Sequence, residues 1–151
     1  MINILTNKFA NAVIPVAIVN NTTIAATAVD TLGFDYATIV VQLGATDIAL
    51  SAFKLTECDT SGGSYTDVTG AIFGTSVNDT GSTSTLPSAT DDNKLFVFSV
   101  DCRARKRYLK LAATVGNGST GAYMSAIAIL SRGEQGTRTA AEANLSQRVI
   151  V

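Results

Sequence analysis

Four basic residues lie within five positions of one another, at Arg103, Arg105, Lys106 and Arg107. Clustered guanidinium and ammonium groups bind either the phosphates of a polyanion or an acidic patch on a protein. The whole chain has a formal net charge of −1 and a pI near 5.2, and aromatic side chains are not interleaved with the cluster. These features argue against nucleic acid as the partner. We therefore predict that the cluster contacts a protein.

Carboxylates near this cluster and in the segment before it offer a second kind of chemistry. Asp79, Asp91, Asp92 and Asp101 carry the oxygen ligands that calcium prefers. Their spacing matches no EF-hand loop, and consecutive aspartates in a Ser/Thr-rich segment are typical of solvated turns. We therefore predict no metal site.

Glu57 and Asp59 alternate along a predicted strand, as a carboxylate pair for glycoside hydrolysis would. The sequence has no tryptophan to stack on a sugar, and nothing in it indicates a cleft around the pair. It also has no histidine, which removes Ser-His-Asp and Cys-His nucleophilic catalysis, HExxH sites and every histidine-ligated metal centre. We predict no catalytic residue, no cofactor and no enzymatic activity.

The two cysteines, Cys58 and Cys102, each fall in a predicted strand, where they could face each other. A free cysteine commonly behaves as a small buried hydrophobe, whereas a disulfide needs an oxidising compartment. We predict two buried thiols, with a disulfide as the alternative.

The basic cluster lies between two segments, within residues 94–111, whose apolar side chains repeat at every second position. A period of two is typical of half-buried strands. The sequence therefore predicts a strand, a basic turn and a second strand, together forming a hairpin. The residues expected on the buried faces are Phe96, Phe98, Val100 and Cys102 in the first strand and Leu109, Leu111, Ala113 and Val115 in the continuing second strand.

The rest of the chain repeats this alternation of short β segments and turns. Residues 36–43 and 123–130 are almost continuously apolar, which predicts strands covered on both faces. No long amphipathic helix is found, and 151 residues correspond to one domain. The sequence therefore predicts an all-β antiparallel sandwich or jelly roll. Further strands are expected at residues 12–19 and 23–29, which would form a hairpin, at 50–59, at 65–68 and, within the loop 74–93, at 83–86.

Both ends of the chain lack periodicity, so we expect arms at residues 1–11 and 131–151 around a body at residues 12–130. The apolar run within residues 9–29 is short and contains Pro15, so neither a membrane helix nor a signal peptide is expected. The apolar last residues follow a polar tether and are expected to dock on the body or on a neighbouring subunit. The partner-contact residues predicted in this arm are Arg138, Leu145, Arg148, Val149, Ile150 and Val151.

Three segments, taken in order, resemble a known group of proteins. They are residues 31–41 (TLGFDYATIVV), residues 53–59 with 64–68 (FKLTECD and SYTDV), and residues 106–111 (KRYLKL). Their order is similar to that in small β-sandwich structural proteins of tailed bacteriophages, carried in the head gene cluster. The motifs are structural rather than catalytic, so the resemblance concerns architecture and role in an assembly.

The resemblance implies a virion component at the capsid surface, most directly a capsid decoration (cement) protein that stabilises the phage head by bridging neighbouring capsid subunits. Its partners would be the major capsid protein and copies of itself, as a dimer or trimer. Charged residues make up only 15% of the chain, which suits a protein that buries its surface against neighbours. A neck, tail or head-fibre component and a carbohydrate-binding adhesin module are the alternatives.

Overall fold

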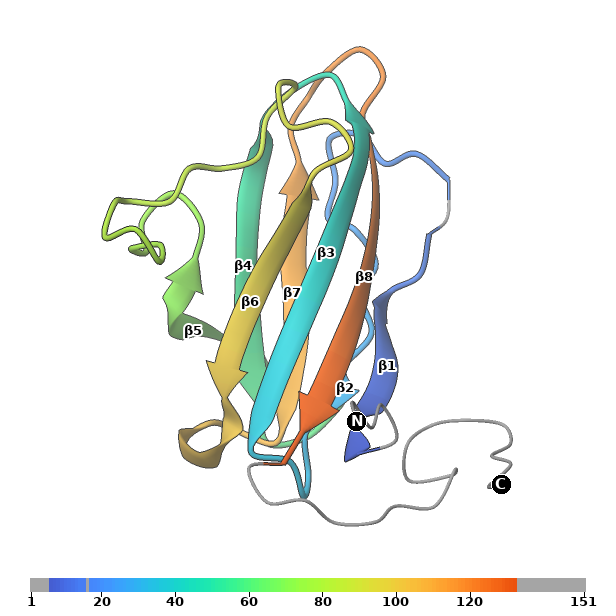
Figure 1. Cartoon of the computed structure of the whole chain (residues 1–151). Coiled ribbons are helices and arrows are strands. Elements are labelled where there is room, and N and C mark those ends of the chain that lie inside the picture. Colours follow the sequence, from blue (N-terminus) through green and yellow to red (C-terminus); the bar gives the residue numbers. More distant parts are fainter. Residues whose placement is uncertain (1–5, 16, 133–151) are drawn as a thin grey trace, which may run out of the picture.

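The computed structural model describes residues 6–15 and 17–132, which form two four-stranded antiparallel sheets packed against each other (Figure 1). The elements are β1 (Lys8–Val13), β2 (Val29–Asp30), β3 (Tyr36–Thr46), β4 (Leu50–Cys58), β5 (Thr66–Ile72), β6 (Leu95–Asp101), the 3₁₀ turn η2 (Cys102–Ala104), β7 (Tyr108–Val115) and β8 (Ala122–Ser131). The predicted antiparallel β-sandwich is confirmed.

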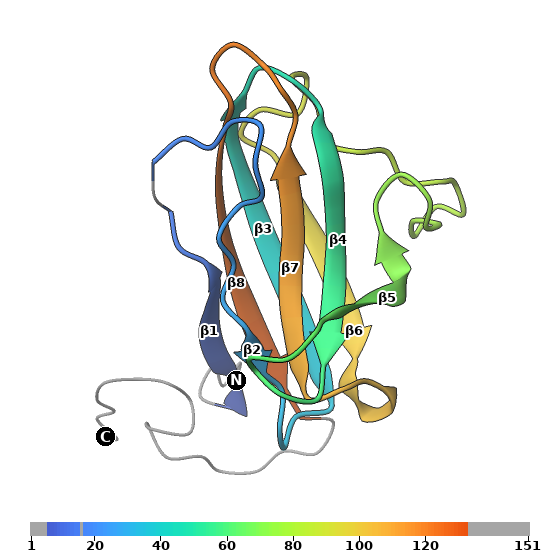
Figure 2. The same ribbon diagram turned by 180° about the vertical axis from the view of Figure 1, so that it is seen from behind.

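We name the two layers by their strands. Sheet A has the order β1-β8-β3-β6 and sheet B the order β2-β7-β4-β5. Sheet A is in front in Figure 1, and sheet B is in front when the molecule is turned around in Figure 2. Among the described strands, only β4 and β5 are neighbours both along the chain and within a sheet. Every other connection between consecutive strands crosses from one sheet to the other.

The core lies between the sheets and follows the predicted period of two. Ile39 and Val41 of β3 face inward and are fully buried, as is Leu111 of β7. Four phenylalanine rings fill one side of this core around Phe53, whose ring centroid lies 4.9 Å from that of Phe73. Aromatic pairs of this kind contribute about 0.5–1.5 kcal/mol each beyond the area that they bury. The other two rings belong to Phe96 and Phe98.

Residues 94–111 form the two predicted strands, but the predicted hairpin is wrong. β6 pairs with β3 in sheet A, whereas β7 pairs with β2 and β4 in sheet B. The connection is therefore an arch between the layers. A period of two identifies the buried face of a strand but not its hydrogen-bonded neighbour. Two consecutive strands with inward apolar faces can therefore lie side by side in one sheet or face each other across the core from different sheets, as β6 and β7 do.

The first part of the chain also differs from expectation, because residues 12–19 and 23–29 form no hairpin. β1 pairs with β8, and Thr23 then makes a single bridge to Thr114 in the other sheet. β1 begins at Lys8, so residues 8–11, which we expected in an arm, belong to sheet A. β4 and β5, which are consecutive in the chain, do pair as a hairpin. Residues 83–86 form no strand, because Thr83 makes only an isolated bridge to Val77.

Candidate functional site

The basic turn lies where β6 ends and the chain crosses toward β7. Arg103 pairs with Asp101 through two contacts, Nη2 to Oδ2 at 2.5 Å and Nε to Oδ1 at 2.9 Å. Its guanidinium lies 5.3 Å from the ring centroid of Tyr36. The hydrogen bond from Arg103 lowers the pKa of the Asp101 carboxyl to about 2. The charge of Arg103 is therefore balanced within sheet A.

Arg107 makes the matching pair on the other side of the arch. Its guanidinium donates to both carboxylate oxygens of Asp30 in β2, at 2.9 and 2.7 Å, and lies 5.0 Å from the ring centroid of Tyr108. The hydrogen bond from Arg107 lowers the pKa of Asp30, and burial opposes that shift. The Arg107 carbonyl accepts hydrogen bonds from both the backbone N–H and the hydroxyl of Thr31. Arg107 therefore fastens the arch to sheet B.

Glu57 binds the middle of the arch from the inner face of sheet B, where it is opposite the buried Leu109. Its Oε2 accepts the backbone N–H of Lys106 at 3.1 Å, and its Oε1 lies 3.8 Å from the Arg105 guanidinium. Its side chain is only 14% exposed. Glu57 is thus a structural anchor, and Asp59, with which it might have formed a carboxylate pair, lies exposed beyond the end of β4.

The structure therefore brings together the four basic residues predicted to contact a partner, but it gives three of them acidic neighbours in the same chain. The fourth, Lys106, donates from Nζ to the hydroxyl of Thr66 at 3.3 Å. Because these groups are occupied, the turn has little unbalanced charge to attract a polyanion. The remaining predicted contact residues lie outside the described residues; they are Arg138, Leu145, Arg148, Val149, Ile150 and Val151.

Two of the aspartates considered as calcium ligands, Asp91 and Asp92, act as acceptors in the loop before β6. Asp91 accepts the backbone N–H of Ser88 at 2.8 Å and pairs with Lys94 Nζ at 2.9 Å, and the Lys94 hydrogen bond is the main cause of its lowered pKa. Asp92 accepts the backbone N–H of Thr46 at 2.8 Å. Within the described part of the chain, no group of three or more His, Cys, Asp or Glu side chains is placed to hold a metal ion.

Cys58 and Cys102 are both free and buried, as the prediction of two buried thiols requires. Burial raises the pKa of the Cys102 thiol to about 11. Because the thiolate is the reactive form of cysteine, this raised pKa disfavours reaction of Cys102 near neutral pH.

The outward side of sheet A, which we call the A face, is the most unusual surface among the described residues. Its central row crosses three strands, because Val40 of β3 lies directly opposite both Val97 of β6 and Ile127 of β8. Cβ atoms of directly opposite residues are about 4.5–5.5 Å apart, so these side chains form one continuous apolar surface. The A face consists of Phe9, Asn11, Tyr123, Ser125, Ile127, Ile129, Ser131, Tyr36, Thr38, Val40, Gln42, Leu95, Val97, Ser99 and Asp101.

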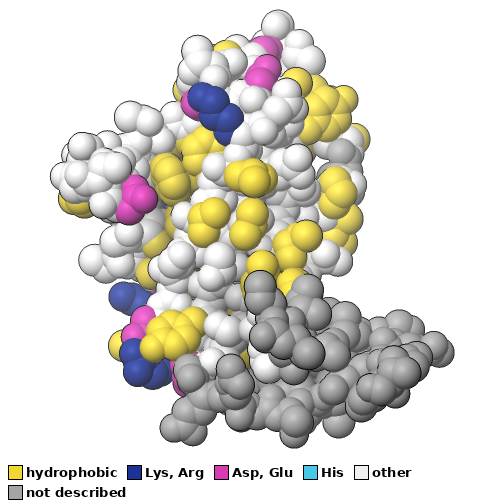
Figure 3. Space-filling view, viewed as in Figure 1, with side chains coloured by type: hydrophobic (Ala, Val, Ile, Leu, Met, Phe, Trp, Pro, Cys, Tyr) yellow, Lys and Arg dark blue, Asp and Glu magenta, His cyan; other side chains and the backbone are white. Residues whose placement is uncertain are grey.

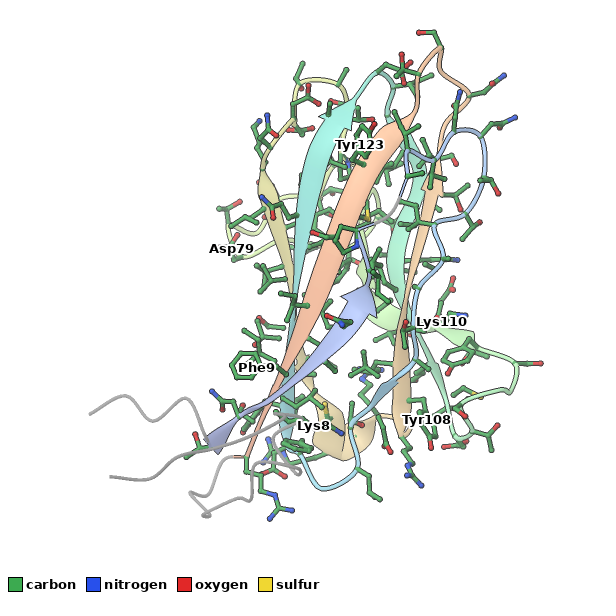
Figure 4. The ribbon with its side chains drawn as sticks, turned by 90° about the vertical axis from the view of Figure 1, so that its right-hand side faces the viewer. Lys8, Phe9, Asp79, Tyr108, Lys110 and Tyr123 are labelled. Atoms are coloured by element: carbon green, nitrogen blue, oxygen red, sulfur yellow. The ribbon has the colours of Figure 1, made fainter. Side chains whose placement is uncertain are left out.

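Large hydrophobic side chains are exposed to solvent on this face. Leu95 is 64% exposed, Ile127 50% and Val97 48%. Figure 3 shows hydrophobic side chains over the middle of the face and charged ones toward its ends. Asp101 is the one charged residue of the A face, and Arg103 neutralises it. In Figure 4, Phe9 lies on the side of sheet A, whereas Tyr108 and Lys110 lie on the side of sheet B.

The sequence prediction missed this face because it expected β3 and β8 to be covered on both sides. That expectation is wrong for the described residues: Ile127 and Tyr123 are about half exposed, and Val40 is only partly buried. The near-continuous apolar sequence of β3 and β8 did indicate this face, since a strand that is apolar on both faces can be covered by a layer on each side. In the described sandwich, only the inward faces of β3 and β8 have such a layer, which is sheet B.

Comparison with profiles of known protein families, with curated protein sequences and with solved structures gives no significant match. A search of the described residues for a helix long and apolar enough to cross a membrane also finds none. The likeness to phage head proteins therefore rests on the sequence motifs alone.

Proposed function

We propose that this protein is a structural component of a larger assembly and binds its partner through the A face. The observation that carries the proposal is the uncharged apolar row Ile127–Val40–Val97, in which Ile127 and Val97 are about half exposed. Contiguous exposed apolar surface on a folded domain marks an interaction site. A rigid sheet with no unbalanced charge suits a flat protein surface better than a small molecule.

The energetics of this face favour association. Complete burial of a Val, Leu or Ile side chain contributes about 1.5–3 kcal/mol. Because about half or more of each of Leu95, Val97 and Ile127 is still exposed, covering each contributes about 1–2 kcal/mol more. The surrounding Ser, Thr, Asn and Gln side chains can hydrogen-bond across the contact without the cost of desolvating a charge.

The specific assembly that we propose is the head of a tailed bacteriophage, with this chain as a capsid decoration protein. Support comes from the motif resemblance and from the physics of the role. A decoration protein adds buried interface between neighbouring capsid subunits and needs no catalytic centre. The sandwich provides the rigid body and the A face provides the adhesive surface. The major capsid protein is the proposed partner.

A pair of matched lysine substitutions tests the contact. Ile127→Lys places a charge in the middle of the A face, whereas Thr69→Lys places the same charge on an exposed position of β5 in sheet B. We expect Ile127→Lys to weaken binding to purified capsids at least tenfold, which corresponds to about 1.4 kcal/mol, while Thr69→Lys leaves binding unchanged. Both proteins should keep their thermal unfolding temperature, which verifies folding.

Equal binding by the two variants would overturn the role of the A face. The identity of the assembly is tested separately by imaging purified particles for the position and copy number of the chain. Many copies over the head surface support decoration, whereas a few copies at the neck, tail or fibres would replace it with one of those roles. Glycan binding by the isolated protein, together with its absence from particles, would favour an adhesin.

A further inference from the structure

The loop between β7 and β8 contains the only Asn-Gly sequence in the chain, at Asn117 and Gly118. It lies at the end of the sandwich opposite the arch between β6 and β7, beside the connection from β3 to β4 (Figure 1). Asparagine deamidates when the backbone nitrogen of the next residue attacks its side-chain amide, and glycine hinders this attack least because it has no side chain. Asn117 is exposed, so water can reach it.

The loop leaves no room at Gly118 for a larger residue, which would slow this reaction. Asp47, between β3 and β4, binds the loop: its carboxylate accepts the backbone N–H of Gly121 at 2.9 Å and the hydroxyl of Ser119 at 3.0 Å. A Cβ atom on Gly118 would lie 2.7 Å from the carboxylate carbon of Asp47, closer than packed carbon atoms approach. The labile pair therefore has a structural reason to be present.

The side chain of Asn20 holds both polar backbone groups of Gly118. Its Oδ1 accepts the Gly118 N–H at 3.2 Å, and its Nδ2 donates to the Gly118 carbonyl at 2.8 Å. Asn20 is positioned by the preceding residue, Val19, which exchanges two backbone hydrogen bonds with Ala122 at the start of β8, at 3.0 and 2.8 Å. The nitrogen that would attack Asn117 is therefore already hydrogen-bonded to a side chain that the fold holds in place.

We propose that Asn117 is a site of spontaneous deamidation and that Asn20 sets its rate by holding the Gly118 nitrogen. In this reaction, the Gly118 N–H gives its proton to a base in the solvent, and the nitrogen forms a bond to Cγ of Asn117. The Cγ–Nδ2 bond of Asn117 breaks, and the leaving nitrogen takes a proton from solvent and departs as ammonia. Water then opens the succinimide ring at either carbonyl, which leaves aspartate or isoaspartate at position 117.

Both products change this end of the sandwich. Each adds one negative charge to a chain whose formal net charge is −1. The new carboxylate lies within the loop that also binds the Asp47 carboxylate, where a second negative charge is unfavourable. Isoaspartate also adds one carbon to the main chain, which shifts Gly118 relative to Asn20. Deamidation therefore loosens the loop, and Asn20 delays that change.

Mass spectrometry of peptides from the full chain, incubated at mildly alkaline pH and digested at intervals, tests the proposal. Asn20→Ala removes both bonds to Gly118. We expect it to deamidate at position 117 at least about fivefold faster than the unmodified protein, a factor that corresponds to about 1 kcal/mol. Asn20→Asp keeps an acceptor for the Gly118 N–H and should retain most of the protection. In urea, where no such bond forms, all three proteins should react at one common and faster rate.

A matched control separates the Asn20 bond from general loosening of the loop. Ser119→Ala removes the hydroxyl that donates to Asp47 but leaves the Gly118 nitrogen bonded to Asn20, so its rate should equal that of the unmodified protein. Equal acceleration by Ser119→Ala and Asn20→Ala would overturn the role of Asn20, as would an unchanged rate in Asn20→Ala. The comparison of the unmodified protein with and without urea needs no variant. Equal rates there, or no deamidation at position 117 in urea, would overturn the proposal.

Discussion

The outward faces of the two sheets are built by the same alternation yet differ in chemistry. On sheet B, Lys54 pairs with Asp67 at 2.8 Å, and Lys110 lies 5.5 Å from the ring centroid of Tyr65. These charges satisfy one another and keep the face hydrated. On sheet A, the corresponding positions carry Val, Ile, Leu, Ser and Thr, with one carboxylate that is neutralised by its neighbour.

The inward faces of the two sheets are alike because folding requires them to be apolar, whereas their outward faces are free to differ. Both sheets contribute inward apolar side chains to one core, so the sandwich itself does not depend on what lies outside. Sheet B shows that this fold tolerates a charged exterior. The apolar exterior of sheet A is therefore not explained by the shared core, and we propose contact with another protein surface as its explanation.

The largest effect is expected from the core that both sheets share. Phe53→Ala removes the ring that contacts Phe73, Phe96 and Phe98, and should lower the free energy of unfolding by about 3–5 kcal/mol. Urea denaturation followed by circular dichroism measures the loss. Because the two sheets share this core, the amides of β8 and β7 should lose their protection from hydrogen exchange together. Protection kept by one sheet alone would show that the layers are separate folding units.

Acid should have an intermediate effect, centred on the arch that joins the sheets. The pKa values of Asp101 in sheet A and Asp30 in sheet B are lowered by their arginine partners, so both carboxylates stabilise the fold above about pH 4. That contribution is lost as the pH falls through the folded pKa, which for Asp101 is about 2. Urea midpoints should therefore decline between about pH 4 and pH 2. The decline should be smaller for Asp101→Asn, and an identical decline would contradict this role.

The smallest effect is expected on the charged face of sheet B. Lys54→Ala breaks the pair with Asp67, whose side chains are 30% and 45% exposed, and should change the free energy of unfolding by about 0.2–1 kcal/mol. Denaturation at low and at high salt measures this contribution, since screening weakens an exposed pair. If the free energy of unfolding fell by more than about 2 kcal/mol, the pair would be needed for folding and would not serve only to keep the outer side of sheet B polar.

The sequence was sufficient to predict the inward faces, because burial imposes a period of two on residues such as Ile39 and Leu111. It was insufficient to predict strand partners. The arch between β6 and β7 depends on Asp30 and Glu57, which are distant in sequence from the basic turn that they hold. The A face was misread for a related reason: whether Ile127 lies under a third layer depends on the whole fold and not on its own strand.

The crossing of nearly every connection between the sheets has a consequence for how the protein is made. β1 pairs only with β8, so residues 8–13 have no ladder partner until residues 126–130 have been synthesised. Closing so long a loop costs entropy before any contact forms, and β topologies of this kind fold in milliseconds to seconds. Sheet A therefore cannot be completed until β8 has been synthesised. Until then the uncharged residues LFVFSV of β6 lack a complete sheet, and apolar strand edges that are exposed during folding are prone to aggregation.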